Sequence, residues 1–589
     1  MKINKLPRKY LVLSFFLTLT YFSQAQNATI NGTVTDINNK LLNGVNIAVL
    51  GTSKGVSTDN TGNYTINGLN QRTYFLQVSY LGYQTITKEV TLDTTEKAVD
   101  FVLYQTSDEL SEVVVTANRR LQNIQKTAAS VSAVNTKKIE QLQVQEIAEL
   151  NAIAPNFRVY DDGGTGSFSI VASRGISTVD FNPTVGLYID DIPYFTTFAF
   201  PLVFSDLDNI EVLRGPQGTL YGRNALAGVI KINTKKPTNE LTGFVNIGAG
   251  NLNAIDLSAG FNLPIVKDKL FFRASTTVSN RDGFVKNTLL DKDLQNRKAV
   301  DANFRLKYLA TDNLNFDLHY SIQRRESDAY AFVLPTAANP DFGIEAITFQ
   351  DIIDDNPYEV SYDLDVFRIS TTENIALSGK YNFGNLSLSS VTAYQITTED
   401  RADEFDFSPA DAQSTRSTID FSNITQEFRL TTSDDKKFDW TLGVFGYRNN
   451  NLSNSINRFG PDLAALGAPF DLLPLPIERP ENSEIVQKGV AFYGQGDYEL
   501  TDKLSLTLGL RYDLEESTAD LFRAVSAFNP EPFELSVKAD FNALSPKAAL
   551  SYKANDDIFV YGSYARGFRP GGINSFVSEV VFILLVHKH

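Results

Sequence analysis

The chain carries few of the side chains that perform acid–base or metal chemistry. Cysteine is absent, the single Met is the first residue, and only His319 among the three histidines lies away from the C-terminal end. No HExxH or GxSxG motif occurs, and no Lys–Ser/Thr pair follows Gly163–Gly166 as it would in a phosphate loop. We therefore predict no catalytic site, no metal site and no cofactor, and we interpret His319 as a solvated strand position.

Two other groups of side chains could bind a partner rather than react with it. After Asp190-Asp191, aromatic residues stand beside polar ones, which is the mixture that ligand pockets use. Tyr194, Phe195 and Phe198 are therefore candidate ligand-binding residues, and packing inside a core is the open alternative. Separately, Val113–Val115 is a short β-prone run between polar flanks. It could add an edge strand to the sheet of a partner, or simply lead into the next domain.

Charge and the N-terminal segment restrict the partner and the compartment. The 589 residues carry a formal charge of −16, which disfavours nucleic acid and anionic membrane surfaces as partners. Residues 1–25 combine a basic start, the apolar stretch Tyr10–Phe22 and the triplet Ser23-Gln24-Ala25, as a secretory signal peptide does. A membrane anchor is the alternative, but a spanning helix needs about 20 apolar residues. Since no later segment is long, apolar and uncharged, any membrane crossing must use strands.

Residues 26–105 show short alternating strands after the signal peptide. Examples are Thr29–Val34 and Tyr74–Val78, which are separated by turns rich in Asn, Asp and Gly. Short strands at this spacing predict a small β-sandwich. Residues 106–117 then form a polar linker that contains the Val113–Val115 run.

Residues 118–237 mix helical and strand patterns, which predicts an α+β domain. Thr136–Leu150 has helical composition, with Asn135 or Thr136 as its N-cap. The domain closes with Ile210–Pro237, in which two strand-like runs flank a glycine-rich stretch. We predict a β-hairpin there, because glycines allow turns and close backbone approach.

Beyond residue 237 the pattern changes to strands of alternating polarity. In Lys503–Tyr512 the leucines project to one side, while Thr507, Arg511 and other small or polar residues project to the other. A soluble sandwich could show this alternation, but its leucines would need a second sheet to cover them. In a membrane barrel the leucines meet lipid and the polar side lines a wet lumen.

Residues 238–574 contain about fourteen strand candidates by alternation and turn signals. Tight turns such as Thr311–Asn313 and Thr501–Lys503 alternate with long polar stretches, as periplasmic turns and extracellular loops do. Plugged barrels close with about 22 strands, so we predict an incomplete barrel. Residues 575–589 form an aberrant, apolar tail with a basic end, which a fragment or a shifted reading frame would explain.

Several of these stretches resemble one known family. The strings EVLRGP, LYG and GVI in Ile210–Pro237, RGI at Arg174–Ile176 and YIDDIP at Tyr188–Pro193 are similar to the plug domain of TonB-dependent outer-membrane receptors. In residues 26–105, GTVTD, GVNIAVLGT, TDNTGNYTI and VSYLGYQT are similar to carboxypeptidase regulatory-like domains. The resemblance implies a mostly β protein with an N-terminal sandwich, an α+β plug and an antiparallel transmembrane β-barrel.

The resemblance also implies site residues. The segment before the plug resembles a TonB box, so we expect these residues to couple to TonB: Leu110, Ser111, Glu112, Val113, Val114, Val115, Thr116 and Ala117. In the family, arginines at the RGI and LRGP positions meet glutamates on the barrel wall, which implies a latch of Arg174 and Arg214 with Glu427. A cation in a plugged lumen is partly desolvated and needs such a partner. The alternative is that each arginine caps local carbonyl groups.

By resemblance, the protein is a receptor in the outer membrane of a Gram-negative bacterium, with its N-terminal domain in the periplasm. It would import a scarce solute, and a ferric siderophore is favoured over a glycan, vitamin B12 or haem. The partners implied are TonB with its inner-membrane energising complex, outer-membrane lipid and a small-molecule ligand, for which an iron chelate is expected, but not nucleic acid. A barrel-anchored surface adhesion or signalling protein is the alternative of another class.

Overall fold

The structure is a computed structural model that describes residues 28–571 and residue 573. Its gaps fall at 53, 81–82, 105–113, 117, 121, 125–126, 162–168, 179–181, 329–357, 407–408, 433–436, 467–473, 525–531, 556–557 and 572. The predicted signal peptide, the Gly163–Gly166 stretch and the predicted tail therefore lie outside the described residues. The chain divides into two compact units, one built mainly from the residues up to Glu112 and the other from most of the remainder.

The first unit is a small β-sandwich, as predicted. Two four-stranded sheets share one apolar core, to which Ile30, Ile47, Leu76 and Phe101 belong. One sheet contains β4 (Asn63–Leu69), β1 (Ala28–Asp36), β7 (Glu96–Ala98) and β8 (Phe101–Leu103); the other contains β3 (Gly55–Ser57), β2 (Asn46–Val49), β5 (Thr73–Ser79) and β6 (Ile86–Thr91). Alternate residues of each strand point into this core, which explains the period of two in the sequence.

The second unit begins with an α+β domain, called the plug here (residues 114–237). Its five-stranded sheet has the order β11 (Ser130–Asn135), β16 (Leu207–Arg214), β17 (Gly228–Thr234), β14 (Val185–Ile189) and β15 (Ile192–Tyr194). Two smaller pairs are β9 (Val114–Val115) with β10 (Gln122–Asn123), and β12 (Phe157–Asp161) with β13 (Ser169–Ser173). The predicted glycine-rich hairpin is β16 and β17, at the centre of the sheet, and its register places Glu211 opposite Lys231.

The helix predicted over Thr136–Leu150 is two shorter helices. Asn135 caps α2 (Thr136–Leu142), and its side chain accepts a hydrogen bond from the N–H of Lys138. Gln143 then adopts a left-handed conformation that ends the helix, and a 3-10 helix, η3, follows at Ile147–Ala152. The break has a tertiary cause, because the carbonyl of Gln145 accepts from the N–H of Phe204 and residue 146 bridges to residue 203. A continuous helix would keep that carbonyl for itself.

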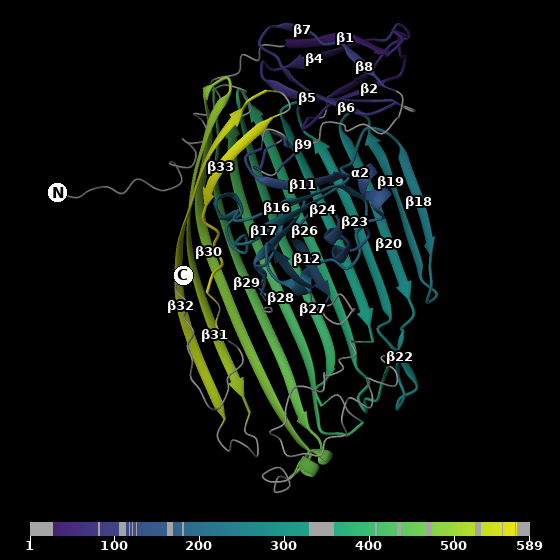
Figure 1. The fold of residues 1–589 in the computed structure, drawn as a ribbon, viewed down its shortest axis with the longest axis vertical. Helices are drawn as coiled ribbons and strands as arrows, with labels where there is room; N and C mark the ends of the chain where they lie inside the picture. The colour runs from purple at the N-terminus through teal and green to yellow at the C-terminus, as the bar shows by residue number, and fades with distance from the viewer. Residues whose placement is uncertain are drawn as a thin grey trace, which may run out of the picture. The chain divides into compact units, whose positions relative to one another are not determined.

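The rest of the second unit is one long sheet, called the wall here, which in the described residues has thirteen strands. Their order follows the chain: β18 (Thr242–Ala249), β19 (Ile255–Val266), β20 (Leu270–Arg281), β23 (Arg297–Leu309), β24 (Leu314–Ser327), β26 (Phe367–Phe383), β27 (Leu386–Glu404), β28 (Gln413–Thr432), β29 (Phe438–Phe459), β30 (Ile477–Thr501), β31 (Leu504–Arg523), β32 (Phe533–Lys553) and β33 (Phe559–Ala565). Figure 1 shows the plug strands against one face of this sheet. The predicted number of about fourteen strands is close to the thirteen strands of the described residues. The predicted incompleteness of the barrel stays a prediction.

Further short elements complete the second unit. They are the small sheet of β22 (Lys292–Leu294), β21 (Val285–Asn287) and β25 (Glu359–Val360), and the single-turn helices η4 (Thr197–Ala199), α3 (Gly218–Tyr221) and η6 (Pro461–Leu466). Short turns join the wall strands at one end, for example between β26 and β27, and longer connections join them at the other, as between β24 and β26. This asymmetry matches the predicted alternation. None of the helices in the described ranges is both long enough and apolar enough to cross a bilayer.

The two sides of β31 differ in the way that the sequence predicts for a membrane barrel. Leu508 and Leu510 are 55% and 51% exposed, whereas Arg511 on the opposite side is 3% exposed. A soluble sandwich would bury these leucines under a second sheet. The polar side of the strand instead faces the plug, where Gly222 packs against the guanidinium of Arg511. The wall is therefore apolar outside and polar inside.

This arrangement predicts the cost of a charge on the outer side. In lipid vesicles, Leu510→Lys should lower the free energy of unfolding by about 2–4 kcal/mol, because the leucine row meets hydrocarbon. Thr518→Lys is the matched control: it lies on the same side of β31, beyond the leucine row and beside Glu516, and should cost roughly 0–1 kcal/mol. Urea titration of both variants measures the difference, and equal losses would contradict a lipid-facing row.

Candidate functional site

The segment predicted to couple to TonB is docked into the plug. Strand β9 pairs antiparallel with β10, so part of the predicted edge strand already has a partner within the chain. Val115 is fully buried in an apolar cluster that includes Tyr493 of the wall. The N–H and the hydroxyl of Thr116 donate to Glu211 Oε1 at 2.9 and 2.8 Å. Leu110–Val113 and Ala117 lie outside the described residues.

Lys231 connects this docked segment to the partly buried carboxylate of Asp191. Its Nζ donates to Thr116 Oγ1 at 2.7 Å and lies 3.1 Å from Asp191 Oδ1. Arg119 Nη1 donates to the same Asp191 oxygen at 2.9 Å, and its guanidinium stacks on the rings of Tyr188 and Tyr221. Two cations of the plug therefore converge on one carboxylate.

A third cation reaches Asp191 from the wall. Arg429 Nη2 on β28 donates to Asp191 Oδ2 at 3.2 Å, while its Nη1 lies 3.4 Å from Glu427 on the same strand. Tyr493 on β30 donates to Glu427 Oε1 at 2.6 Å. We call the set of Thr116, Glu211, Lys231, Asp191, Arg119, Arg429, Glu427 and Tyr493 the coupling network. It forms an unbroken chain of polar contacts from the docked segment to the wall.

The coupling network is electrically balanced, with three cations and three carboxylates. Burial alone would raise the pKa of the Asp191 carboxyl, but Lys231, Arg429 and Arg119 together hold that pKa well below its usual range. Burial raises the pKa of the Glu211 carboxyl, although Lys231 and the Thr116 hydrogen bonds act in the opposite direction. Removing any one charge therefore leaves another buried without full compensation.

The neighbouring aspartate binds a different part of the wall. Asp190 and Asp191 form a two-residue turn between β14 and β15, and both have positive φ angles. Asp190 accepts from the N–H and the hydroxyl of Thr234 at 3.1 and 2.7 Å and lies 3.3 Å from Arg305 Nη1 on β23. One turn thus contacts β23 with its first side chain and β28 with its second.

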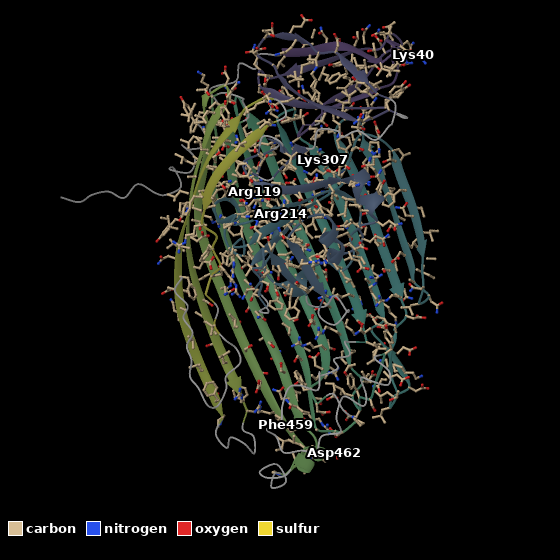
Figure 2. The ribbon with its side chains drawn as sticks, in the orientation of Figure 1. Lys40, Arg119, Arg214, Lys307, Phe459 and Asp462 are labelled. Carbon is tan, nitrogen blue, oxygen red and sulfur yellow. The ribbon has the colours of Figure 1, made fainter. Side chains whose placement is uncertain are left out.

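The predicted latch is wrong in its plug residues. Figure 2 labels Arg214 on β16, close to Arg119 in that view. Arg214 Nη1 donates to the carbonyl of Pro155 at 2.9 Å, and the backbone N–H of Arg174 donates to the carbonyl of Asn156. The Arg174 guanidinium packs on the backbone at Gly215, next to Arg214, rather than on Glu427. For Arg214 the alternative of a local carbonyl cap describes the contact, while Glu427 is satisfied by Tyr493 and Arg429 and lies near Arg119.

The predicted ligand-binding aromatics are buried between the plug and the wall. Tyr194 accepts a hydrogen bond from Asn374 on β26 at 3.0 Å. The ring of Phe195 lies 5.2 Å from that of Tyr447, and the ring of Phe198 lies 5.6 Å from that of Phe421. All three are at most 3% exposed. The core-packing alternative therefore describes them, and wall residues such as Tyr447 and Phe421 are among their neighbours.

His319 also differs from its prediction. It is buried on the plug-facing side of β24, where its Nε2 lies 3.1 Å from Asn303 Oδ1 and its Nδ1 lies 3.6 Å from Asp190. The period of two placed it on a strand but did not show which side the plug covers. The residues that the sequence analysis missed had a visible signal, because Asp190-Asp191 separates two strands by two residues and Arg119 lies two residues after the TonB-box-like segment.

The plug sheet lies on the polar side of the wall, and leucines are exposed on the opposite side of the wall. These two features define the class of plugged β-barrel receptors. Family profiles agree: "TonB-dependent Receptor Plug Domain" matches residues 123–229, "TonB dependent receptor-like, beta-barrel" matches 333–579, and "CarboxypepD_reg-like domain" matches 30–115. The plug and barrel profiles together cover more than half of the chain. The chain belongs to the family of TonB-dependent receptors, with a CarboxypepD_reg-like domain at its N-terminal side.

Individual relatives share this architecture at low identity. The pesticin receptor of Yersinia pestis is 24% identical over 475 residues, which are 79% of this chain and 64% of that protein. The vitamin B12 transporter BtuB of Vibrio vulnificus is 32% identical over 152 residues, 25% of this chain and 24% of that protein. The crystal structure of the ferric yersiniabactin uptake receptor FyuA from Yersinia pestis superposes with a TM-score of 0.66 at 22% identity, over 77% of this chain and 66% of that one. The chain thus spans just under two thirds of the length of the pesticin receptor.

The balance of the coupling network can be tested by removing its central charge. Asp191→Asn should lower the free energy of unfolding by about 3 kcal/mol, because the buried cations Lys231, Arg119 and Arg429 then share too little negative charge. Asp312→Asn, in the short turn between β23 and β24, should change stability by no more than about 0.5 kcal/mol. Denaturant titration in detergent measures both. A loss at Asp191 as small as that at Asp312 would show that the network is not a stabilising element.

Proposed function

We propose that this protein is an outer-membrane receptor that binds a scarce solute and imports it with energy delivered by TonB. The single observation that carries the proposal is the docked β9 segment, because it is joined to the wall through the coupling network. A pull on that segment has a defined set of contacts to break: the polar contacts of Thr116, which water can replace, and the apolar contacts of Val115. The likeness to receptors for pesticin and ferric yersiniabactin supports the same reading.

The coupling step follows from the contacts of Thr116. TonB, driven by its inner-membrane complex, would pair with residues 110–117 by adding a strand to its own sheet. This pairing needs β9 to leave β10, so Thr116 withdraws from both Glu211 and Lys231. Those two groups are then left without one partner each, which weakens the hold of Lys231 on Asp191. The wall contact through Arg429 loosens in consequence.

The solute we propose is a ferric siderophore. The similar receptors named above for pesticin and ferric yersiniabactin support it, while the shorter match to a vitamin B12 transporter keeps that solute as the second choice. The location follows from the wall, whose outer leucines suit the hydrocarbon of the outer membrane and whose inner side suits water. Its N-terminal sandwich would then lie in the periplasm, on the side from which TonB approaches. The protein has no proposed enzymatic role.

A strand-breaking substitution tests the energised step. Val114→Pro removes a backbone N–H from β9 and disfavours strand pairing, whereas Val114→Ala keeps the backbone intact. In iron-starved cells offered a panel of ⁵⁵Fe-loaded catecholate, hydroxamate and carboxylate siderophores, Val114→Pro should reduce uptake at least tenfold and leave surface binding unchanged. Val114→Ala should transport within twofold of the unmodified protein.

Two outcomes would contradict the proposal. Uptake that persists in Val114→Pro, or in a variant without residues 110–117, would favour a barrel-anchored adhesion or signalling protein. Growth that depends on the protein under glycan limitation, but not under iron limitation, would replace the siderophore with a glycan as the solute.

A further inference from the structure

Two glycines of the wall lie beneath tyrosine rings of the neighbouring strand. Gly443 belongs to β29, and a Cβ built there would lie 2.1 Å from Cζ and 2.4 Å from the hydroxyl oxygen of Tyr493 on β30. The reverse arrangement also occurs, because a Cβ at Gly489 on β30 would lie 2.5 Å from Cε1 of Tyr447 on β29. Figure 1 shows the two strands side by side. Each strand therefore offers the other a position without a side chain, and a tyrosine ring fills it.

The ring of Tyr493 is held on its other sides as well. Its hydroxyl donates to Glu427 Oε1 at 2.6 Å, and its centroid lies 5.4 Å from the guanidinium carbon of Arg511. The ring also belongs to the same apolar cluster as Val115 of the docked segment. Tyr493 is only 4% exposed, so the ring has little room to swing. One ring thus contributes both to the polar coupling network and to the apolar surroundings of the docked segment.

The ring of Tyr447 contacts another part of the plug. The guanidinium carbon of Arg223 lies 4.9 Å from the centroid of Tyr447 and 5.1 Å from that of Phe195, and the two ring centroids are 5.2 Å apart. This stack includes neither Val115 nor a member of the coupling network. The two glycines therefore support rings with different partners, so a change at one glycine is a control for the same change at the other.

We infer that Gly443 is a positioning residue for the docked segment, because its missing side chain lets Tyr493 lie across β29. From there the ring reaches both Glu427 and the cluster that contains Val115. This inference rests on the proposed function, in which TonB pairs with that segment, and adds to it a wall residue that sets where the segment rests. Glycine is otherwise unfavourable inside a strand, since it packs no side chain and loses much conformational entropy on folding. The contacts of the ring that covers Gly443 offset this cost.

A methyl group at position 443 would displace the ring. Carbon atoms in contact are about 3.5–4.0 Å apart, so Tyr493 would have to move by more than about 1 Å to admit a Cβ. A shift of this size breaks the 2.6 Å hydrogen bond to Glu427 and opens the cluster around Val115. The same change at Gly446 on β29 meets no such obstacle, since the nearest atom to a Cβ there is 3.8 Å away.

The chain has no cysteine, so a single thiol can report on the docked segment without TonB or a solute. Val115→Cys places this thiol at a fully buried position of β9. It is combined in turn with Gly443→Ala, with Gly489→Ala, which creates a similar clash beneath the other ring, and with Gly446→Ala, which creates none. The rate of labelling with a hydrophilic maleimide is then measured in outer membranes isolated from cells that lack TonB.

We expect Gly443→Ala to accelerate labelling of the thiol at position 115 at least fivefold. Gly489→Ala and Gly446→Ala should leave the rate within twofold of that with all three glycines intact. Equal acceleration by Gly443→Ala and Gly489→Ala would overturn the inference, since any clash in this part of the wall would then loosen the docked segment. An unchanged rate in Gly443→Ala would overturn it as well, because the segment would not depend on where the ring lies.

Removal of the ring separates its placement from a general defect in folding. Tyr493→Ala leaves Gly443 in place and should accelerate labelling at position 115 at least as strongly as Gly443→Ala does. In that background Gly443→Ala should change the rate by less than twofold, because the ring that it would displace is gone. Should Gly443→Ala alone fail to fold, the double variant must fold and label like Tyr493→Ala.

Two results with these ring variants would contradict a role through the ring. One is a double variant that fails to fold although Tyr493→Ala folds, and the other is a Tyr493→Ala chain that labels at the unmodified rate. Failure of the TonB proposal would appear separately, as uptake that survives Val114→Pro, and would leave the labelling rates as they are.

Discussion

One partly buried carboxylate, that of Asp191, is shared by three cations, two from the plug and one from the wall. Lys231 and Arg119 belong to the plug and Arg429 to the wall, so the Asp191 side chain joins the two parts of the unit. Burying these charges is costly, and the cost is offset only while the set is complete. The contact between plug and wall at Asp191 therefore depends on Thr116. It is stable while Thr116 is hydrogen-bonded to Glu211 and Lys231, and it weakens when Thr116 moves away.

Apolar contacts form the interior of the plug, whereas many of the contacts between the plug and the wall are polar. The main apolar core of the plug is formed only by plug residues, such as Leu150, Leu187, Ile210 and Ile230, so the plug is a folded body in its own right. Its boundary with the wall combines ion pairs and hydrogen bonds with small apolar clusters. Polar contacts can be exchanged for contacts with water at small net cost, whereas an opened apolar core cannot. The polar contacts between the plug and the wall can therefore open while the core of the plug stays folded.

Local patterns in the sequence were sufficient to predict the strands and turns. They were not sufficient to predict which side chains meet between the plug and the wall. The glycine-rich hairpin, the two sides of β31 and the small sandwich were all predictable, because each follows from a period of two or from turn chemistry. The break at Gln143 was not, since it depends on a contact with Phe204, sixty residues away. The pairing of Arg174 and Arg214 with Glu427 failed for the same reason, because which cation meets which carboxylate is decided by the seating of the plug. His319 shows that periodicity finds a strand but not what covers it.

The Asp190-Asp191 turn carries a further consequence. A two-residue hairpin with two positive φ angles is most easily made by Asn-Gly, and a residue with a Cβ in that conformation costs roughly 1–2 kcal/mol. Two aspartates in succession are therefore a poor choice for the turn alone. Their side chains offset this backbone cost, because Asp190 pairs with Arg305 on β23 and Asp191 pairs with Arg429 on β28. The turn thus ties two wall strands that are not neighbours in the sheet to the same point of the plug.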